Sequence, residues 1–265
     1  MQQSGSKKYT DLFGYHILSD AQLDFYNEKG YLILGHTLKS QGLKLMLNEC
    51  MQAWFEDKDE FDPDRTWLQN ALLTNIHRKS KTVRDYYFEG PLVDVAEQII
   101  GPNIKGVTTQ LTFKMRGNTM PFNWHQDNGY GELDPYNAIS CLTALEDNDE
   151  KSGCLRIIPG SHKEGQVKIQ HSSNDKDKYK DIKLEVDETQ SIPVPLKAGE
   201  CLLFNCWMLH KSEGNFSKDR DRRIVFMRYA DADAVEVYND CKPRLGRLVR
   251  GKTQFPEVAA YEADL

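Results

Sequence analysis

The chain has 265 residues, with 34 Lys and Arg against 40 Asp and Glu, a formal net charge of −6 and 39% hydrophobic residues. It contains no run of about 18–20 apolar residues, the length that a membrane span requires. A mildly acidic chain without a basic stripe is also a poor candidate for nucleic-acid binding. The first twenty residues lack the apolar segment of a secretory signal, so we expect a cytoplasmic protein whose six cysteines are reduced thiols.

The first third of the chain is predicted to be helical. One helix begins at the N-cap residue Ser19 and ends at Gly30, and a short strand follows it. Within 43–55, apolar residues up to and including Phe55 recur at the spacing of one helix face, which predicts an amphipathic helix facing the core. A third helix begins at Pro91, because proline suits the first turn.

After residue 106 the pattern changes to short runs of β-branched and aromatic residues separated by turn residues. The predicted strands are 107–115, 139–145, 154–158, 192–196, 201–207 and 224–229. Many short strands without intervening helices indicate an antiparallel sandwich or barrel. We therefore expect a mainly β fold with flanking helices in one domain, made of a helical part (about 1–105), a β core (about 106–235) and a tail (about 236–265).

Two His-x-acid sequences are the first candidates for chemistry, although seven histidines and 40 acidic residues give about one such spacing by chance. His162-Lys163-Glu164 follows a Pro-Gly-Ser turn and is expected to lie in a solvated loop. His125-Gln126-Asp127 lies in the strand-rich region, where residues i and i+2 point to the same side. His125 and Asp127 are therefore predicted to converge on one point.

A third metal ligand must come from elsewhere in the chain. His210 follows the apolar run 201–209, which we expect to be one strand ending at this histidine. By itself His210 is more typical of a buried core position. Together with His125 and Asp127 it gives two imidazoles and one carboxylate, the ligand set of non-haem Fe(II) oxygenases. The same set binds zinc, so these residues alone leave the metal open.

Two adjacent arginines begin the predicted strand that follows His210. Arg222 and Arg223 must point to opposite faces of this strand, so only one of them points inward. An inward arginine would bind a dicarboxylate through its planar fork of donors. The alternative is a charged strand edge that faces water.

Several segments together resemble the phytanoyl-CoA dioxygenase family. They are Trp124-His125-Gln126-Asp127-Asn128, the run from Ser152 to His162 that contains Pro159-Gly160-Ser161-His162, His210-Lys211-Ser212, and Arg222. The resemblance covers most of residues 19–230. It implies a double-stranded β-helix (jelly-roll, cupin-like) core and a dioxygenase that uses Fe(II), 2-oxoglutarate and dioxygen and releases succinate and carbon dioxide.

The resemblance also implies roles for individual residues. The predicted iron ligands are His125, Asp127 and His210. Arg222 is the predicted partner of the 2-oxoglutarate C5 carboxylate, with Arg223 as the alternative if the register shifts by one. Further cosubstrate contacts are expected from Ser212, Gln110, Lys114 and Asn128. His162 matches a turn of the family and is expected to be structural.

The resemblance favours hydroxylation of a C–H bond over halogenation, because Asp127 is a carboxylate where related halogenases have a small residue. The substrate is expected to be a small molecule. Lys114, Arg116 and the basic run 242–250 would favour an anionic substrate, or this run simply packs against the barrel. The polar segment 170–190 is a candidate lid. The alternative function is an inactive metal-binding jelly roll that serves as a sensor or scaffold.

Overall fold

The computed structural model describes residues 8–57, 72–130, 132–167, 184 and 186–265. Most of the candidate lid 170–190 lies outside these residues. The helices are α1 (Asp20–Lys29), α2 (Ser40–Asp57), α4 (Lys81–Glu89), α5 (Pro91–Ile100) and α6 (Pro256–Ala260). The strands are β1 (Tyr31–His36), β2 (Leu72–Thr74), β3 (Ile104–Lys114), β4 (Phe122–His125), β5 (Leu133–Asp134), β6 (Ile139–Ala144), β7 (Leu155–Ile157), β8 (Ile192–Val194), β9 (Glu200–Asn205), β10 (His210–Ser212), β11 (Arg222–Asp231), β12 (Val235–Glu236), β13 (Lys242–Pro243) and β14 (Arg247–Arg250).

Local sequence signals fix the ends of α1. The Ser19 hydroxyl accepts a hydrogen bond from the Gln22 N–H, and the Gln22 side chain accepts one from the Ser19 N–H, which completes a capping box. Gly30 ends the helix at φ 78°, and a Cβ there would lie 2.4 Å from His162 Nδ1. Only glycine satisfies both the backbone conformation and the close contact. The predicted start and end of this helix are confirmed.

Helix α2 confirms the predicted amphipathic helix, but one part of its expected core face is wrong. Met46, Cys50 and Ala53 are buried, whereas the Phe55 side chain is 58% exposed. Phe55 lies about 200° around the helix from Ala53, since successive residues are separated by about 100°. The apolar stripe is therefore broader than the face that packs against the protein.

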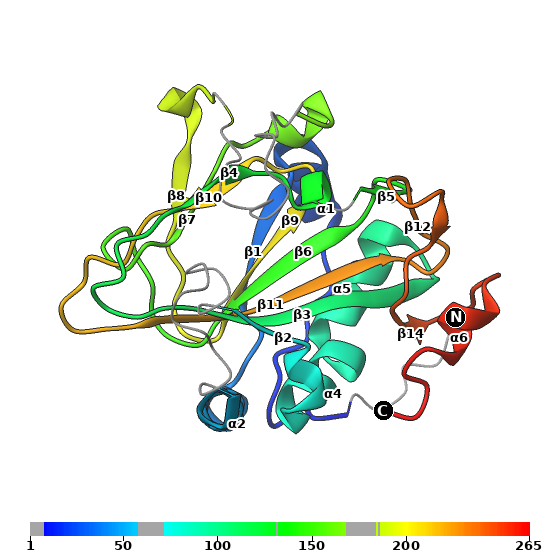
Figure 1. Ribbon diagram of the computed structural model, residues 1–265, viewed down its shortest axis with the longest axis horizontal. Coiled ribbons are helices and arrows are strands. Elements are labelled where there is room, and N and C mark those ends of the chain that lie inside the picture. The colour runs from blue at the N-terminus through cyan, green and yellow to red at the C-terminus, as the bar shows by residue number, and fades with distance from the viewer. Residues whose placement is uncertain (1–7, 58–71, 131, 168–183, 185) are drawn as a thin grey trace.

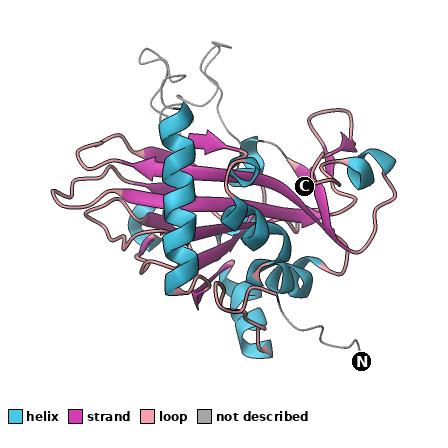
Figure 2. Cartoon of the chain, turned by 90° about the horizontal axis from the view of Figure 1, so that it is seen from below, coloured by secondary structure: helices cyan, strands magenta, loops and turns pink. Residues whose placement is uncertain are grey.

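Two antiparallel sheets form the jelly-roll core. The larger has the order β1-β9-β6-β11-β3-β14, with β2 also paired to β3, and the smaller has the order β4-β10-β7-β8. Figure 1 shows the small sheet above the large sheet, and helices α2 and α4 below the large sheet. In Figure 2 the long helix α2 crosses the strands of the large sheet.

The large sheet is apolar on both faces, because each face packs against another layer. Leu142, Leu202 and Phe204 belong to a cluster between the two sheets, together with Ile157 of β7. Their neighbours along the strands, such as Cys141 and Leu203, pack with the helices in the main core. This explains why the strand sequences are apolar runs rather than alternating patterns.

The C-terminal segment completes the sheets rather than trailing from them. Strand β14 pairs with β3 at the edge of the large sheet, and β12 and β13 form a small sheet with β5. Arg250 of β14 forms ion pairs with Asp94 and Glu97 of α5. In the part of the chain that the structure describes, no helix is long and apolar enough to cross a membrane. A cytoplasmic location stays a prediction.

Candidate active site

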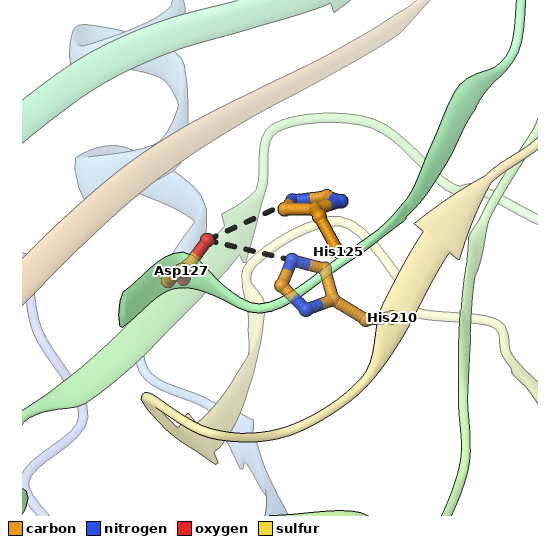
Figure 3. A group of neighbouring side chains, drawn as sticks. All are labelled: His125, Asp127 and His210. Atoms are coloured by element: carbon orange, nitrogen blue, oxygen red, sulfur yellow. Dashed lines mark ion pairs between the residues drawn. The ribbon is translucent and has the colours of Figure 1, made fainter. Parts of the chain in front are cut away.

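Three side chains from separate elements converge at one point between the two sheets. His125 ends β4, Asp127 begins a 3-10 helix, and His210 begins β10. The Asp127 Oδ1 atom lies 3.7 Å from His125 Nε2 and 3.5 Å from His210 Nε2 (Figure 3). One ligand atom from each residue lies within 4.8 Å of the others, and no other such group of His, Cys, Asp or Glu occurs among the described residues.

The backbone conformation that brings these three residues together differs from the predicted one. Strand β4 ends at His125, so the chain turns before Asp127 and the two-residue strand period does not bring the pair together. His210 does not end the strand of 201–209, because β9 ends at Asn205 and His210 starts β10 opposite His125. Trp207 and Met208 are buried in the intervening turn. The apolar run therefore continues through the turn, so the sequence pattern gives no sign that the strand ends at Asn205.

Hydrogen bonds orient all three side chains. His125 Nδ1 lies 2.8 Å from the Asn123 carbonyl oxygen, and His210 Nδ1 lies 2.9 Å from that of Met208. A carbonyl accepts only, so each Nδ1 must donate, and each Nε2 keeps its lone pair for the shared point. The Ser140 hydroxyl donates to Asp127 Oδ2, which leaves Oδ1 facing the imidazoles.

The electrostatic environment favours the protonation states that a divalent metal needs. Burial, reinforced by the neighbouring His210, lowers the pKa of His125 to about 3, so this imidazole is neutral at pH 7. Burial alone would raise the pKa of Asp127, but His210, His125 and Arg228 outweigh it and hold this pKa below its ordinary value. The site therefore presents a neutral imidazole and an ionised carboxylate, and its donors fit a divalent transition metal.

The three side chains line a cavity of about 500 Å³, a typical size for a small-molecule site. Arg222 lies at one end of it and is only 3% exposed, with its Nε buried and without a hydrogen-bond partner. Lys114, opposite Arg222 on β3, donates from Nζ to the carbonyl and hydroxyl oxygens of Ser212 at 3.0 and 2.9 Å. Gln110 lines the same cavity, on the same face of β3 as Lys114. The structure thus brings four of the predicted cosubstrate residues together.

Two further candidates take other positions. Arg223 points away from the cavity and forms ion pairs with Glu146 at 2.5 Å and Asp221 at 2.9 Å. The Asn128 amide exchanges hydrogen bonds with the backbone of Leu133 and accepts one from Arg228, and it does not line the cavity. This geometry favours a structural role for Asn128 over a cosubstrate contact.

The sequence analysis missed Arg228, which also lines the cavity. The sequence could have indicated Arg228, because this residue follows Arg222, Ile224 and Phe226 on the same face of β11 at a spacing of two. The sequence analysis named Arg244 only as part of the basic run 242–250 that would favour an anionic substrate, and of the arginines in this run Arg244 is the one that lines the cavity. Arg244 lies between β13 and β14, and nothing in the run 242–250 distinguishes it from Arg247 and Arg250.

The sequence pattern of the family described as Phytanoyl-CoA dioxygenase (PhyH) matches residues 26–224, which include all three convergent side chains and Arg222. The chain belongs to the phytanoyl-CoA dioxygenase family. Members of this family are non-haem iron oxygenases that use 2-oxoglutarate and dioxygen. The expected family, enzyme class and cofactors are therefore confirmed.

Among its relatives, this phytanoyl-CoA dioxygenase family member is 27% identical over 238 residues to the methylphosphonate hydroxylase of Gimesia maris, covering 86% of this chain and 87% of that protein. It is 25% identical over 268 residues to the ectoine dioxygenase of Halomonas elongata, covering 93% of this chain and 77% of that protein. The solved structure of apo ThoJ, a non-heme monooxygenase, has a TM-score of 0.71 at 21% identity, covering 90% of this chain and 85% of that one. EctD from S. alaskensis with 2-oxoglutarate and 5-hydroxyectoine has a TM-score of 0.68 at 20% identity, covering 93% of each chain. These structures confirm the jelly-roll fold.

Proposed function

We propose that the protein is an Fe(II)- and 2-oxoglutarate-dependent dioxygenase that hydroxylates a C–H bond of a small molecule, with release of succinate and carbon dioxide. The observation that carries this proposal is the convergence of His125, Asp127 and His210 at one cavity that also contains the buried Arg222. The two relatives named as a hydroxylase and a dioxygenase of small molecules support it.

In this proposal His125 Nε2, His210 Nε2 and Asp127 Oδ1 hold the iron. The bound iron, with dioxygen and 2-oxoglutarate, supplies the oxidising power that no side chain has. The role of the protein is to fix the three ligands through Asn123, Met208 and Ser140 and to leave the remaining coordination positions open.

Arg222 is the proposed partner of the distal carboxylate of 2-oxoglutarate. Burial lowers its pKa to about 10, so the guanidinium is still charged at neutral pH, and it forms no salt bridge with any described residue. Such a buried charge is favourable only when an anion pairs with it. Ser212 and Lys114 lie at the same end of the cavity. The Ser212 hydroxyl would donate a hydrogen bond to the carboxylate, and the Lys114 amine would add a positive charge beside it.

Asp127 favours hydroxylation over halogenation. Its carboxylate occupies a ligand position that a halide would need, and Ser140 holds it there. A smaller residue at 127 would free that position.

The decisive assay incubates the protein with Fe(II), ascorbate and 2-oxoglutarate and measures succinate. We expect succinate above the level of a His210→Ala control, and a weak visible band when Fe(II) and 2-oxoglutarate are added without oxygen. Binding of both without succinate would instead support the sensor or scaffold alternative. Zinc-dependent activity without the visible band would support a hydrolase.

A further inference from the structure

The cavity has a second cationic end opposite Arg222. Arg222, Ile224, Phe226 and Arg228 all line it from one face of β11. The Cα atoms of Arg222 and Arg228 are six residues apart, which corresponds to about 20 Å along a strand. The two side chains therefore leave the strand at opposite ends of the cavity. This backbone separation exceeds the length of one short dicarboxylate, so we assign a dicarboxylate at Arg222 to that end and treat the Arg228 end as available to a second ligand.

Arg228 has the surroundings of an anion-binding residue. It is 8% exposed, its Nη2 donates to Asn128 Oδ1 at 2.5 Å, and its Nε is buried without a hydrogen-bond partner. It forms no salt bridge within the described part of the chain, whereas Arg223 on the opposite face of the same strand has two carboxylates. The other contacts of Arg228 are a hydrogen bond with the Cys206 side chain and a favourable charge interaction with Asp127, whose carboxylate is a metal ligand in the proposed function. A buried guanidinium without a carboxylate of its own is costly unless an anion completes its donors.

Arg244 adds a second positive charge at this end. One edge of its guanidinium donates to Glu236 Oε1 at 2.6 Å, and Glu236 also accepts from Asn239. Arg244 still lines the cavity, as does Tyr238. Because Glu236 takes only one nitrogen, the guanidinium keeps further donors for the cavity.

We propose that Arg228 and Arg244 bind the acid group of the primary substrate, which is therefore a small organic oxyacid, a carboxylate or a phosphonate. This inference rests on the proposed function, since it assigns the Arg222 end to 2-oxoglutarate. Arg228 contacts Asn128, the residue directly after Asp127. The acid group therefore lies close to the metal ligands, and the oxidised carbon is separated from it by only a few bonds.

A binding experiment tests the acid site without turnover. The anaerobic protein loaded with Fe(II) and 2-oxoglutarate is titrated calorimetrically with propionate and with methylphosphonate, and in parallel with the neutral methyl esters of both acids. We expect saturable binding of at least one acid and at least tenfold weaker binding of its ester. The difference between the two acids identifies the preferred oxyacid.

Variants assign the binding to this end. Arg228→Gln and Arg244→Gln should each weaken acid binding at least tenfold, and Arg228→Lys should recover part of the loss if the charge matters. Arg220→Gln is the matched control, because Arg220 is as exposed as Arg244 (35%) and also pairs with a carboxylate, but does not line the cavity. Arg244 lies nearer the surface than Arg228, so its variant keeps the test valid if Arg228→Gln fails to fold.

The outcomes separate this inference from the proposed function. Equal binding of acids and esters, no binding of either acid, or acid binding unchanged in both glutamine variants would overturn the oxyacid site, even with active enzyme. If 2-oxoglutarate neither binds nor turns over, the proposed function fails. The same titration without 2-oxoglutarate, comparing wild type with Arg244→Gln, then decides the acid site on its own.

Discussion

His125 and His210 face each other directly across the antiparallel pair β4–β10, with ring centroids 4.0 Å apart. Each lies at the end of its strand nearest Asp127, and each has its Nδ1 bound by a backbone carbonyl two residues earlier. The same local geometry on two paired strands therefore directs two Nε2 atoms to one point. Metal binding should depend on both histidines together rather than on either alone.

Loss of one ligand should abolish metal-dependent turnover. We expect His210→Ala and Asp127→Ala each to lower succinate formation at least about 100-fold, because removal of a ligand costs more than removal of its supporting hydrogen bond. Fe(II) binding, measured by equilibrium dialysis, should fall in parallel. His162→Ala is the control, since it disrupts the other His-x-acid sequence, which lies outside the ligand group. A wild-type level of Fe(II) binding in His210→Ala would contradict the assignment.

The Ser140 hydroxyl should tune the metal site without being a ligand. Ser140→Ala removes the hydrogen bond to Asp127 Oδ2 and frees the carboxylate to rotate, so Fe(II) affinity should fall about 10- to 100-fold. Ser217→Ala removes another buried serine hydroxyl, which donates to the Arg220 carbonyl, and should leave Fe(II) affinity unchanged. Equal affinities in both variants would show that Ser140 does not orient the ligand.

Arg222 and Arg223 should respond differently to the same substitution. Arg222→Gln should raise the KM for 2-oxoglutarate about 10- to 150-fold, since a hydrogen bond to a charged group contributes about 1.5–3 kcal/mol. Arg223→Gln leaves Glu146 and Asp221 without their ion-pair partner and should lower the free energy of unfolding by about 1–3 kcal/mol. Urea unfolding and steady-state kinetics on both variants check this. A larger KM effect for Arg223→Gln would reverse the assignment.

The affinity for 2-oxoglutarate should depend on pH through Lys114. Burial, together with the charge of Arg222, lowers the pKa of Lys114 to about 6, so its amine is mostly neutral at pH 7.5. A bound dianion would favour the charged amine and raise this pKa, so binding takes up a proton above pH 6. Affinity should therefore be highest below about pH 6 and weaken by at most about tenfold per pH unit as the pH rises.

Titrations of 2-oxoglutarate between pH 6 and 9 measure this slope. Calorimetry in two buffers of different ionisation enthalpy measures the proton uptake directly. Lys114→Met should remove both the slope and the uptake. Wild-type binding that is independent of pH would contradict the assignment of Lys114 to the cosubstrate end.

The amino-acid sequence by itself determined the features that depend on neighbouring residues. The capping signals of Ser19 and Gly30 define α1, and the alternation along β11 places Arg222 and Arg223 on opposite faces. The His-x-acid spacing and the ligand set that His210 completes indicated His125, Asp127 and His210, and the family resemblance agreed, but the strand geometry expected for them was wrong at Asp127 and His210. Local periodicity fails there because turns interrupt the strands at 126 and 206–209, and burial keeps the second turn apolar.

Only the tertiary structure decided which distant residues share the cavity. Arg244 reaches the same space as Arg228 because β12 and β13 fold the C-terminal segment back onto β5. Asn128 has the type and position of a site residue, yet Leu133 and Arg228 occupy its amide. Such contacts join segments far apart in the chain. They follow from how the sheets pack against each other, which no short pattern of residues encodes.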